Sequence, residues 1–144
     1  MKKIPDKRNN YLKFYKLDTR WKDNDIYGHI NNVVYYEYFD SAVNLWLIEN
    51  NLLNLQESRY VGYIVESGCN YFSPISHPAK IFIGIKVSKV GNSSVTYKCA
   101  IFKDTSEKCS AQGFFTHVYV DRKKEISMPI SSRFRDKLKL ITLD

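Results

Sequence analysis

The sequence lacks the cysteine spacing of a disulfide framework or a thiolate metal site. Its 144 residues include Cys69, Cys99 and Cys109, with no C-x-x-C pair among them. An odd number of widely spaced cysteines predicts free thiols, and free thiols fit a reducing compartment, here the cytoplasm. Cys69 and Cys99 stand among apolar residues of expected strands, where cysteine more often fills the core than acts as a nucleophile.

Long apolar runs are also missing. No stretch of about 18 apolar residues occurs, as a membrane-spanning helix would require. The charged start, MKKIPDKRNN, has no apolar segment behind it as a signal peptide would. The G-x-S-x-G motif of serine hydrolases is absent as well. No repeat or low-complexity linker divides the chain, so we expect one domain over residues 1–144 and no membrane partner.

Positive charge and aromatic rings are in excess. The 22 Lys and Arg against 15 Asp and Glu give a net charge of +7, which attracts anions without identifying them. The tightest basic run is Arg122, Lys123 and Lys124. Aromatic residues make up 15% of the chain, more than a core alone would need, so some are expected to line a cleft. No nucleic-acid motif occurs, and we expect no nucleic-acid partner.

The hydrophobic pattern predicts one long helix over residues 33–48. The segment VVYYEYFDSAVNLWLI is too long for a strand and contains neither Gly nor Pro. Its polar residues fall at helical spacing on one narrow stripe: Glu37, Asp40, Ser41 and Asn44. The other faces are apolar, so the helix belongs inside the fold, and the residues expected to be buried are Val33, Tyr36, Phe39, Val43, Trp46 and Leu47.

Strands account for most of the remaining chain. Alternation with a period of two predicts an early strand and then an antiparallel meander of four strands, at 11–21, 62–72, 80–90, 94–102 and 111–120. The helix is about as long as such a strand and can lie along the sheet. A long antiparallel sheet wrapped around one central helix is the hotdog fold, of the α+β class, and its exposed edge commonly pairs across a dimer axis.

Residues 19–32, TRWKDNDIYGHINN, concentrate the polar chemistry in the loop before the helix. A calcium loop would use Asp23, Asp25 and Gly28, but the closing ligand position falls on Val34 instead of Glu. A transition-metal site would need His77 or His117 to join the loop, and nothing in the sequence fixes either one there. We therefore expect no metal.

A third interpretation places a carboxylate beside the helix start. Unpaired N–H groups around His29 to Asn32 would polarise a thioester carbonyl, and Asp25 would attack it or activate a water. Gly28 would let the backbone pass close to the substrate. The alternative, in which Asp25 only complements the helix dipole and Asn31 only caps the helix, also fits these residues.

The segment RWKDNDIYGHINN at 20–32, followed by VVYYEYFDSAVN, resembles the signature of hotdog-fold acyl-CoA thioesterases of the 4-hydroxybenzoyl-CoA thioesterase type. Similarity continues through VESGCNYFSP at 65–74, GNSSVTYKCAIF at 91–102 and AQGFFTHVYVDR at 111–122. The resemblance implies that the second Asp of D-x-D-x-x-G, Asp25, is the catalytic carboxylate. It also implies oxyanion donors among the N–H groups at the start of the helix.

The expected site has two parts. The catalytic set consists of Asp25, Gly28, His29 and Asn32. The substrate-binding set consists of Tyr27, Asn31, Glu66, Ser93, Ser94, Arg122, Lys123 and Lys124. The three basic residues of this set would hold CoA phosphates. Some hotdog thioesterases carry their carboxylate on the central helix, which makes Glu37 and Asp40 reserve candidates. Glu66, in the matching segment of an expected strand, is another that could approach the site across a dimer interface, as could Ser93 or Ser94.

The sequence thus predicts a cofactor-free homodimer or homotetramer that hydrolyses acyl-CoA to the free acid and CoA. Two alternatives stay open. An acidic acyl carrier protein would be drawn by the same positive field, and a non-catalytic hotdog protein could bind an acyl thioester without cleaving it. The acyl group itself is not encoded in any motif.

Overall fold

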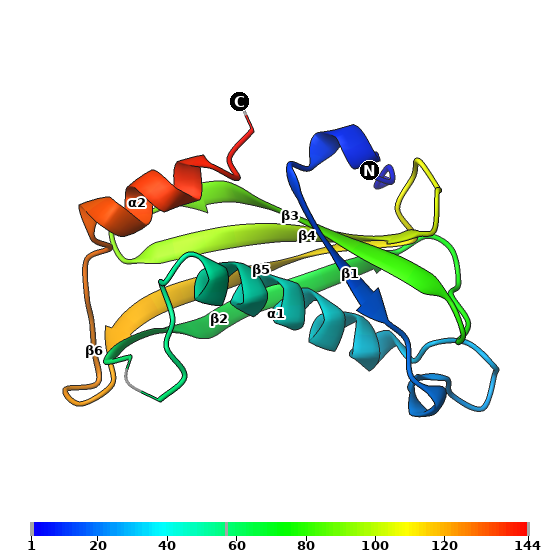
Figure 1. Ribbon diagram of the computed structural model, residues 1–144, viewed down its shortest axis with the longest axis horizontal. Coiled ribbons are helices and arrows are strands. Elements are labelled where there is room, and N and C mark those ends of the chain that lie inside the picture. The colour runs from blue at the N-terminus through cyan, green and yellow to red at the C-terminus, as the bar shows by residue number, and fades with distance from the viewer. Residues whose placement is uncertain (1, 57, 144) are drawn as a thin grey trace.

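The computed structural model describes residues 2–56 and 58–143. An antiparallel sheet curls around the long helix α1 (Asn32–Glu49), the α+β hotdog arrangement expected from the sequence (Figure 1). The sheet contains β1 (Lys13–Asp18), β2 (Tyr60–Tyr71), β3 (Lys80–Val90), β4 (Ser94–Lys103), β5 (Ala111–Asp121) and β6 (Ile126–Ser127). A second helix, α2 (Ser132–Lys139), and two short 3-10 turns, Arg8–Asn10 and Trp21–Asp23, complete the elements.

The strand order corrects the expected meander. It runs β1-β3-β4-β5-β2, with β6 paired to β5, so consecutive pairing holds only from β3 to β5. After β2 the chain crosses through residues 72–79, where buried Ile75 accepts a hydrogen bond from the N–H of Ile30 at 2.7 Å. This contact pins the crossing to the loop before α1 and leaves β2 at an edge of the sheet.

Helix α1 begins where its sequence provides a cap. The side chain of Asn31 accepts a hydrogen bond from the N–H of Val33 at 3.0 Å, as an N-cap should. The face toward the sheet buries Tyr35, Tyr38, Phe39, Ala42, Val43, Trp46 and Leu47. The expected burial of Val33 is wrong, because this residue lies on the opposite side of the helix and is 68% exposed. Tyr36 is half-buried and packs against Phe115 of β5.

Helix α2 was not predicted from the sequence. Ser131 caps it by accepting the N–H of Phe134, and the helix buries Phe134 and Leu138 in the main core. On the outer face of the sheet, Tyr11 packs with Phe102 in a smaller apolar cluster. In the described ranges, neither helix is long and apolar enough to span a bilayer.

His117 of β5 is buried with unpaired polar atoms. It is 4% exposed, and neither ring nitrogen has a hydrogen-bond partner in the described structure. Its ring lies against that of Tyr97, with centroids 5.1 Å apart. The glycine at position 62 of β2 makes room for the His117 ring, since a Cβ there would stand 2.7 Å from Nδ1 of His117. Burial lowers the pKa of His117 from 6.5 to about 4.

This depressed pKa predicts a specific loss of stability in acid. Between pH 6.5 and about 4 the unfolded chain binds a proton at His117 that the folded chain does not. The free energy of unfolding should therefore fall by up to about 1.4 kcal/mol per pH unit as the pH decreases through this window. Urea titrations across it should show that His117→Phe removes this component, whereas exposed His29→Gln keeps it. If the free energy of unfolding depends on pH equally in the wild type and in His117→Phe, the loss of stability does not come from His117.

Candidate active site

The loop before α1 is anchored by Asp23, which is 1% exposed. Its carboxylate accepts hydrogen bonds from the backbone N–H and Nε of Arg20, both at 2.9 Å, and from the hydroxyl of Tyr38 on α1. Its carbonyl accepts the N–H of Asn31 at 2.9 Å. Burial alone would raise the pKa of Asp23, but the hydrogen bonds from Tyr38 and Arg20 hold the pKa below its usual value. Asp23 thus ties both ends of the loop to the helix.

The reserve carboxylates on α1 have other surroundings. Glu37 pairs with the guanidinium of Arg20 at 2.7 Å, and this hydrogen bond lowers the pKa of Glu37. Asp40 is half-buried one turn further along, and burial raises its pKa. Neither side chain lines the cavity that contains Asp25.

Asp25 sits in a tight turn of the same loop. Its Oδ1 accepts the N–H of Tyr27 at 2.9 Å, and its own N–H donates to the carbonyl of His29 at 2.8 Å. Gly28 closes the turn with a φ of 79°, a left-handed conformation that favours glycine. The hydroxyl of Ser76 holds the carbonyl of Gly28 at 2.9 Å. The carboxylate of Asp25 is half-buried, so it stays accessible to a ligand.

A cavity of about 480 Å³ opens beside this turn at the start of α1. Four expected site residues line it, namely Asp25, Tyr27, His29 and Asn32. Gly28 and Asn31 shape the loop and cap the helix without lining the cavity. In the described part of the chain, the backbone N–H groups of His29 and Asn32 donate to no protein acceptor. Two residues with free N–H groups and one residue with a carboxylate therefore line the same cavity.

Two residues that line the Asp25 cavity were not predicted from the sequence. Tyr35 of α1 and Tyr71 of β2 line the cavity with their rings edge to face, 5.1 Å apart. The hydroxyl of Tyr71 donates to the carbonyl of Asn32 at 2.9 Å, which fixes the end of β2 to the helix start. A signal for Tyr71 was present, since it lies near the end of the strand expected at 62–72 and shortly before Pro74, which also lines the cavity.

Glu66 lies away from the cavity. It stands opposite Thr116 in the β2–β5 ladder, whereas the next residue on β5, Phe115, faces inward and packs on Tyr36 of α1. Glu66 is therefore on the outer face of the sheet. Ser93 and Ser94 are at the opposite end of the sheet, where the carbonyl of Ser93 accepts the N–H of Tyr119.

The basic run also belongs to that far end. Asp121 accepts the backbone N–H groups of Lys123 at 2.9 Å and Lys124 at 3.2 Å, which shapes the turn after β5. Asp121 pairs with Arg59 at 2.8 Å, and this hydrogen bond lowers the pKa of Asp121 to about 2. Strand β5, at about 3.3 Å per residue, puts this turn roughly 30 Å from the Ala111 end near Tyr71. Arg122, Lys123 and Lys124 do not reach Asp25 of their own chain.

The histidines considered for a metal site are separated. Nδ1 of His77 lies 2.6 Å from the hydroxyl of Thr19, and His117 is enclosed by aromatic rings on β5. Asp23 is occupied by Arg20 and Tyr38. Among the residues that the structure describes, no group of three His, Cys, Asp or Glu side chains could hold a metal ion.

The loop, α1 and most of the sheet coincide with a known family. The model of the thioesterase-like superfamily matches residues 19–138. The chain belongs to the thioesterase-like superfamily. The PA5185 protein from Pseudomonas aeruginosa strain PAO1, known from a crystal structure, is 42% identical to this chain, with a TM-score of 0.93 over 96% of this chain and 97% of that one.

Two more distant proteins are also similar, one in structure and one in sequence. A thioesterase from Thermus thermophilus, crystallised with coenzyme A and Zn, is 22% identical and has a TM-score of 0.74 over 88% of this chain and 91% of that one. The uncharacterised protein YsmA of Bacillus subtilis (strain 168) is 25% identical over 89 residues. That alignment covers 62% of this chain and 60% of YsmA, less than two thirds of the relative.

The two loop carboxylates should respond differently to loss of charge. Asp23→Asn should lower the free energy of unfolding by about 2–3 kcal/mol, since it weakens several buried hydrogen bonds to a charged group. The matched variant Asp25→Asn should change it by less than about 0.5 kcal/mol. The Asp23→Asn deficit should shrink below about pH 4, because a carboxylate with a depressed pKa loses its stabilising effect on protonation. Urea unfolding measures both; equal destabilisation by the two variants would contradict this anchoring role.

Proposed function

We propose that this protein is an acyl-CoA thioesterase whose active site is the cavity at the start of α1. The observation that carries the proposal is the half-buried carboxylate of Asp25 beside the free N–H groups of His29 and Asn32. The partial positive charge at the start of the 18-residue helix favours an oxyanion at the same place. In a member of the thioesterase-like superfamily, this combination suits cleavage of a thioester.

The chemistry follows two possible routes from one geometry. The thioester carbonyl oxygen accepts hydrogen bonds from the N–H groups, which strengthen as negative charge develops on it. Asp25 then attacks the carbonyl carbon, expels the CoA thiolate and forms an anhydride that water hydrolyses. Alternatively, Asp25 takes a proton from a water that attacks the carbon directly. Both routes yield the free acid and CoA, and neither needs a cofactor.

The surroundings of the site favour a second copy of the chain. Tyr27 is 80% exposed beside the cavity, and Val33 is also largely exposed on the first turn of α1. Edge strand β2 carries the exposed apolar side chains Tyr63, Ile64 and Val65. An unpaired edge with apolar side chains is a template for strand pairing. We propose a homodimer in which two β2 strands pair antiparallel, or a homotetramer built from two such dimers.

This dimer would give the distant basic turn a role. Antiparallel pairing about a two-fold axis puts the Tyr60 end of one β2 beside the Tyr71 end of the other. The turn containing Arg122, Lys123 and Lys124 would then approach the Asp25 cavity of the second copy. CoA carries its phosphates far from the thioester, so a basic rim supplied by the other chain fits the substrate. The Thermus thermophilus thioesterase crystallised with coenzyme A is consistent with such a ligand.

An acyl carrier protein substrate is the second candidate function, favoured by the same positive charge. Acyl-CoA and acyl carrier protein thioesters with identical acyl chains distinguish the two by their kcat/KM values. A hotdog protein that binds the thioester and hydrolyses neither is the third outcome of this assay.

Asp25→Asn should lower thioester hydrolysis by at least about a hundredfold, because either route needs the negative charge and basicity of the carboxylate. Binding should survive, since the N–H groups remain. Steady-state hydrolysis of a panel of short, long and aryl CoA thioesters measures the first effect, and titration with the preferred substrate measures the second. Glu37→Gln and Asp40→Asn are the controls. Near-normal turnover in Asp25→Asn with loss in either control would refute the assignment.

Charge at the β2 edge should break the assembly. Val65 is 62% exposed at the bulge of β2, and Val65→Lys would bring like charges together where two copies meet. The wild type should be a dimer or tetramer by light scattering at micromolar concentration, and this variant a less active monomer. Leu140→Lys, which adds the same charge at an exposed site directly after α2, should leave assembly and activity intact. A fully active wild-type monomer would contradict the shared site.

The basic turn can be tested by mixing chains. Lys123→Glu with Lys124→Glu should raise KM, more at low salt, with little change in kcat, because remote phosphate contacts bind ground and transition states alike. After subunit exchange with Asp25→Asn, one site of each mixed dimer combines an intact Asp25 with intact lysines of the other chain. Activity with a wild-type KM should then appear. A KM that stays high after mixing would place the phosphate contacts within one chain.

A further inference from the structure

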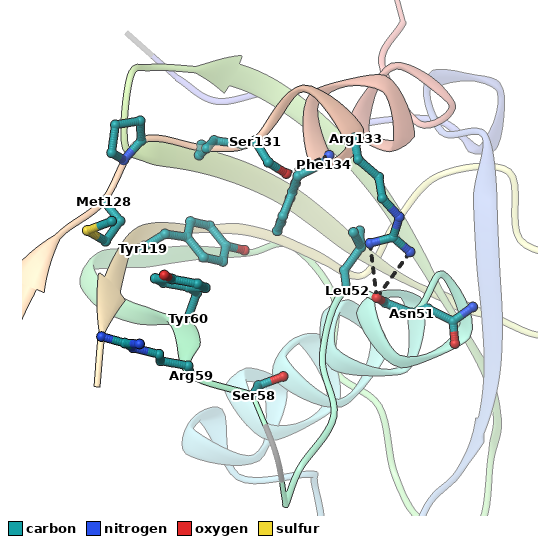
Figure 2. Close-up of a pocket in the computed structure, with 12 residues that line it drawn as sticks. Asn51, Leu52, Ser58, Arg59, Tyr60, Tyr119, Met128, Ser131, Arg133 and Phe134 are labelled. Atoms are coloured by element: carbon teal, nitrogen blue, oxygen red, sulfur yellow. Dashed lines mark hydrogen bonds between the residues drawn. The ribbon is translucent and has the colours of Figure 1, made fainter. Parts of the chain in front are cut away.

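A second cavity, of about 490 Å³, lies at the other end of α1 (Figure 2). Its walls come from the loop after α1, the start of β2, the end of β5 and the segment that leads into α2. It shares no lining residue with the cavity of Asp25. A concave space of this size that combines aromatic and charged groups is typical of a small-molecule site.

Three aromatic side chains surround this space, Tyr60, Tyr119 and Phe134 (Figure 2). The rings of Tyr119 and Phe134 pack edge to face with centroids 4.9 Å apart. The hydroxyl of Tyr119 is bonded to that of Tyr97 at 2.8 Å, which fixes the orientation of its ring. Preset aromatic faces and edges favour a flat ring over a flexible alkyl chain.

The cationic groups of the cavity differ in their partners. Arg59 is neutralised by Asp121 at 2.8 Å. Arg133 reaches the carbonyls of Asn50 and Asn51 at 3.3 Å, and in the described part of the chain no carboxylate pairs with it. A single guanidinium that no carboxylate neutralises suits a ligand with one negative charge. A carboxylate fits best, because its two oxygens match the planar N–H donors of the guanidinium.

A smaller space of about 60 Å³ adjoins this cavity and shares Leu52, Tyr60 and Tyr119 as walls. His117 lines it, with both ring nitrogens unpaired. A buried imidazole without partners costs free energy that a hydrogen-bonding ligand would recover. The side chain of Asn44 lines the same space and offers a further polar contact. The larger cavity therefore has a small polar space directly behind the walls formed by Leu52, Tyr60 and Tyr119.

We propose that the cavity between α2 and the C-terminal end of α1 binds a small aromatic monocarboxylate that carries a hydroxyl on its ring. The carboxylate pairs with Arg133, the ring lies among Tyr60, Tyr119 and Phe134, and the hydroxyl is directed toward His117. A phosphate ester with two charges would lack a second free cation there. The site does not depend on hydrolysis at Asp25.

Calorimetric titration of the full chain with three acids tests this site: 4-hydroxyphenylacetate, phenylacetate and cyclohexylacetate. The first should bind in a saturable manner and most tightly, and the last most weakly, because it has the same charge without an aromatic ring. Arg133→Gln should weaken binding of 4-hydroxyphenylacetate at least tenfold. Arg135→Gln is the matched control, since Arg135 also donates to backbone carbonyls, those of Gly91 and Asn92, and is not among the described residues that line this cavity.

The role of His117 is tested by His117→Phe, which should abolish the preference for 4-hydroxyphenylacetate over phenylacetate while phenylacetate still binds. Melting curves confirm that each variant is folded. Asp25→Asn should bind all three acids as the wild type does, and excess CoA should not displace them. No saturable binding at millimolar concentration, equal affinity in Arg133→Gln, or loss of binding in Asp25→Asn would each overturn the proposal.

Discussion

The buried carboxylate of Asp23 is the constraint on which the geometry of the candidate active site depends. It joins Arg20 at the entry of the loop to Tyr38 on α1, while its carbonyl holds Asn31 at the exit. The turn of Asp25 and Gly28 is thereby fixed against the first turn of the helix. A catalytic group must be held to within a fraction of an ångström of its working position, so a residue that never touches substrate can control the rate.

The two ends of α1 carry opposite partial charges, and the fold uses each end differently. The start, with its free N–H groups, faces a cavity suited to a developing oxyanion. At the other end, the guanidinium of Arg133 donates hydrogen bonds to the carbonyls of Asn50 and Asn51, directly after α1, and also borders the second cavity (Figure 2). Because the helix runs along the sheet, the two cavities lie at opposite ends of the folded molecule (Figure 1). If the β2 edges of two copies pair antiparallel, the end of one copy that carries the Asp25 cavity would lie beside the end of the other copy that carries the second cavity.

Local pattern predicted most of the elements. The helix expected at 33–48 is Asn32–Glu49, and the strand expected at 80–90 is β3 itself, because both follow from periodicities of side-chain burial. The loop before α1 could be singled out as the candidate catalytic segment because its polar residues are contiguous in sequence, and its catalytic role stays a prediction. The pairing of β2 with β5 was not predicted. It depends on the crossing after β2, and that crossing is anchored by a contact between Ile75 and Ile30, which are distant in sequence.

Glu66 shows why alternation alone cannot tell which face of the sheet a residue occupies. Counting by two along β2 from inward-facing Gly62 puts Glu66 on the face toward α1. The ladder shifts between Ile64 and Glu66, and the extra residue, Val65, turns Glu66 to the outer face. The second cavity escaped prediction for a related reason. Its walls come from four separate segments, and Arg133, the cationic residue proposed to bind the ligand, belongs to a helix with too few apolar residues to be recognised from the sequence.

The most direct measurement of the central claim is a crystal structure of the wild-type protein with an acyl-CoA analogue in which a methylene group replaces the thioester sulfur. We predict that the ketone oxygen lies within hydrogen-bond distance of the N–H groups of His29 or Asn32, with the carboxylate of Asp25 facing the carbonyl carbon. A carbonyl bound against Glu37 or Asp40, with Asp25 turned to solvent, would contradict the assignment of this cavity as the active site.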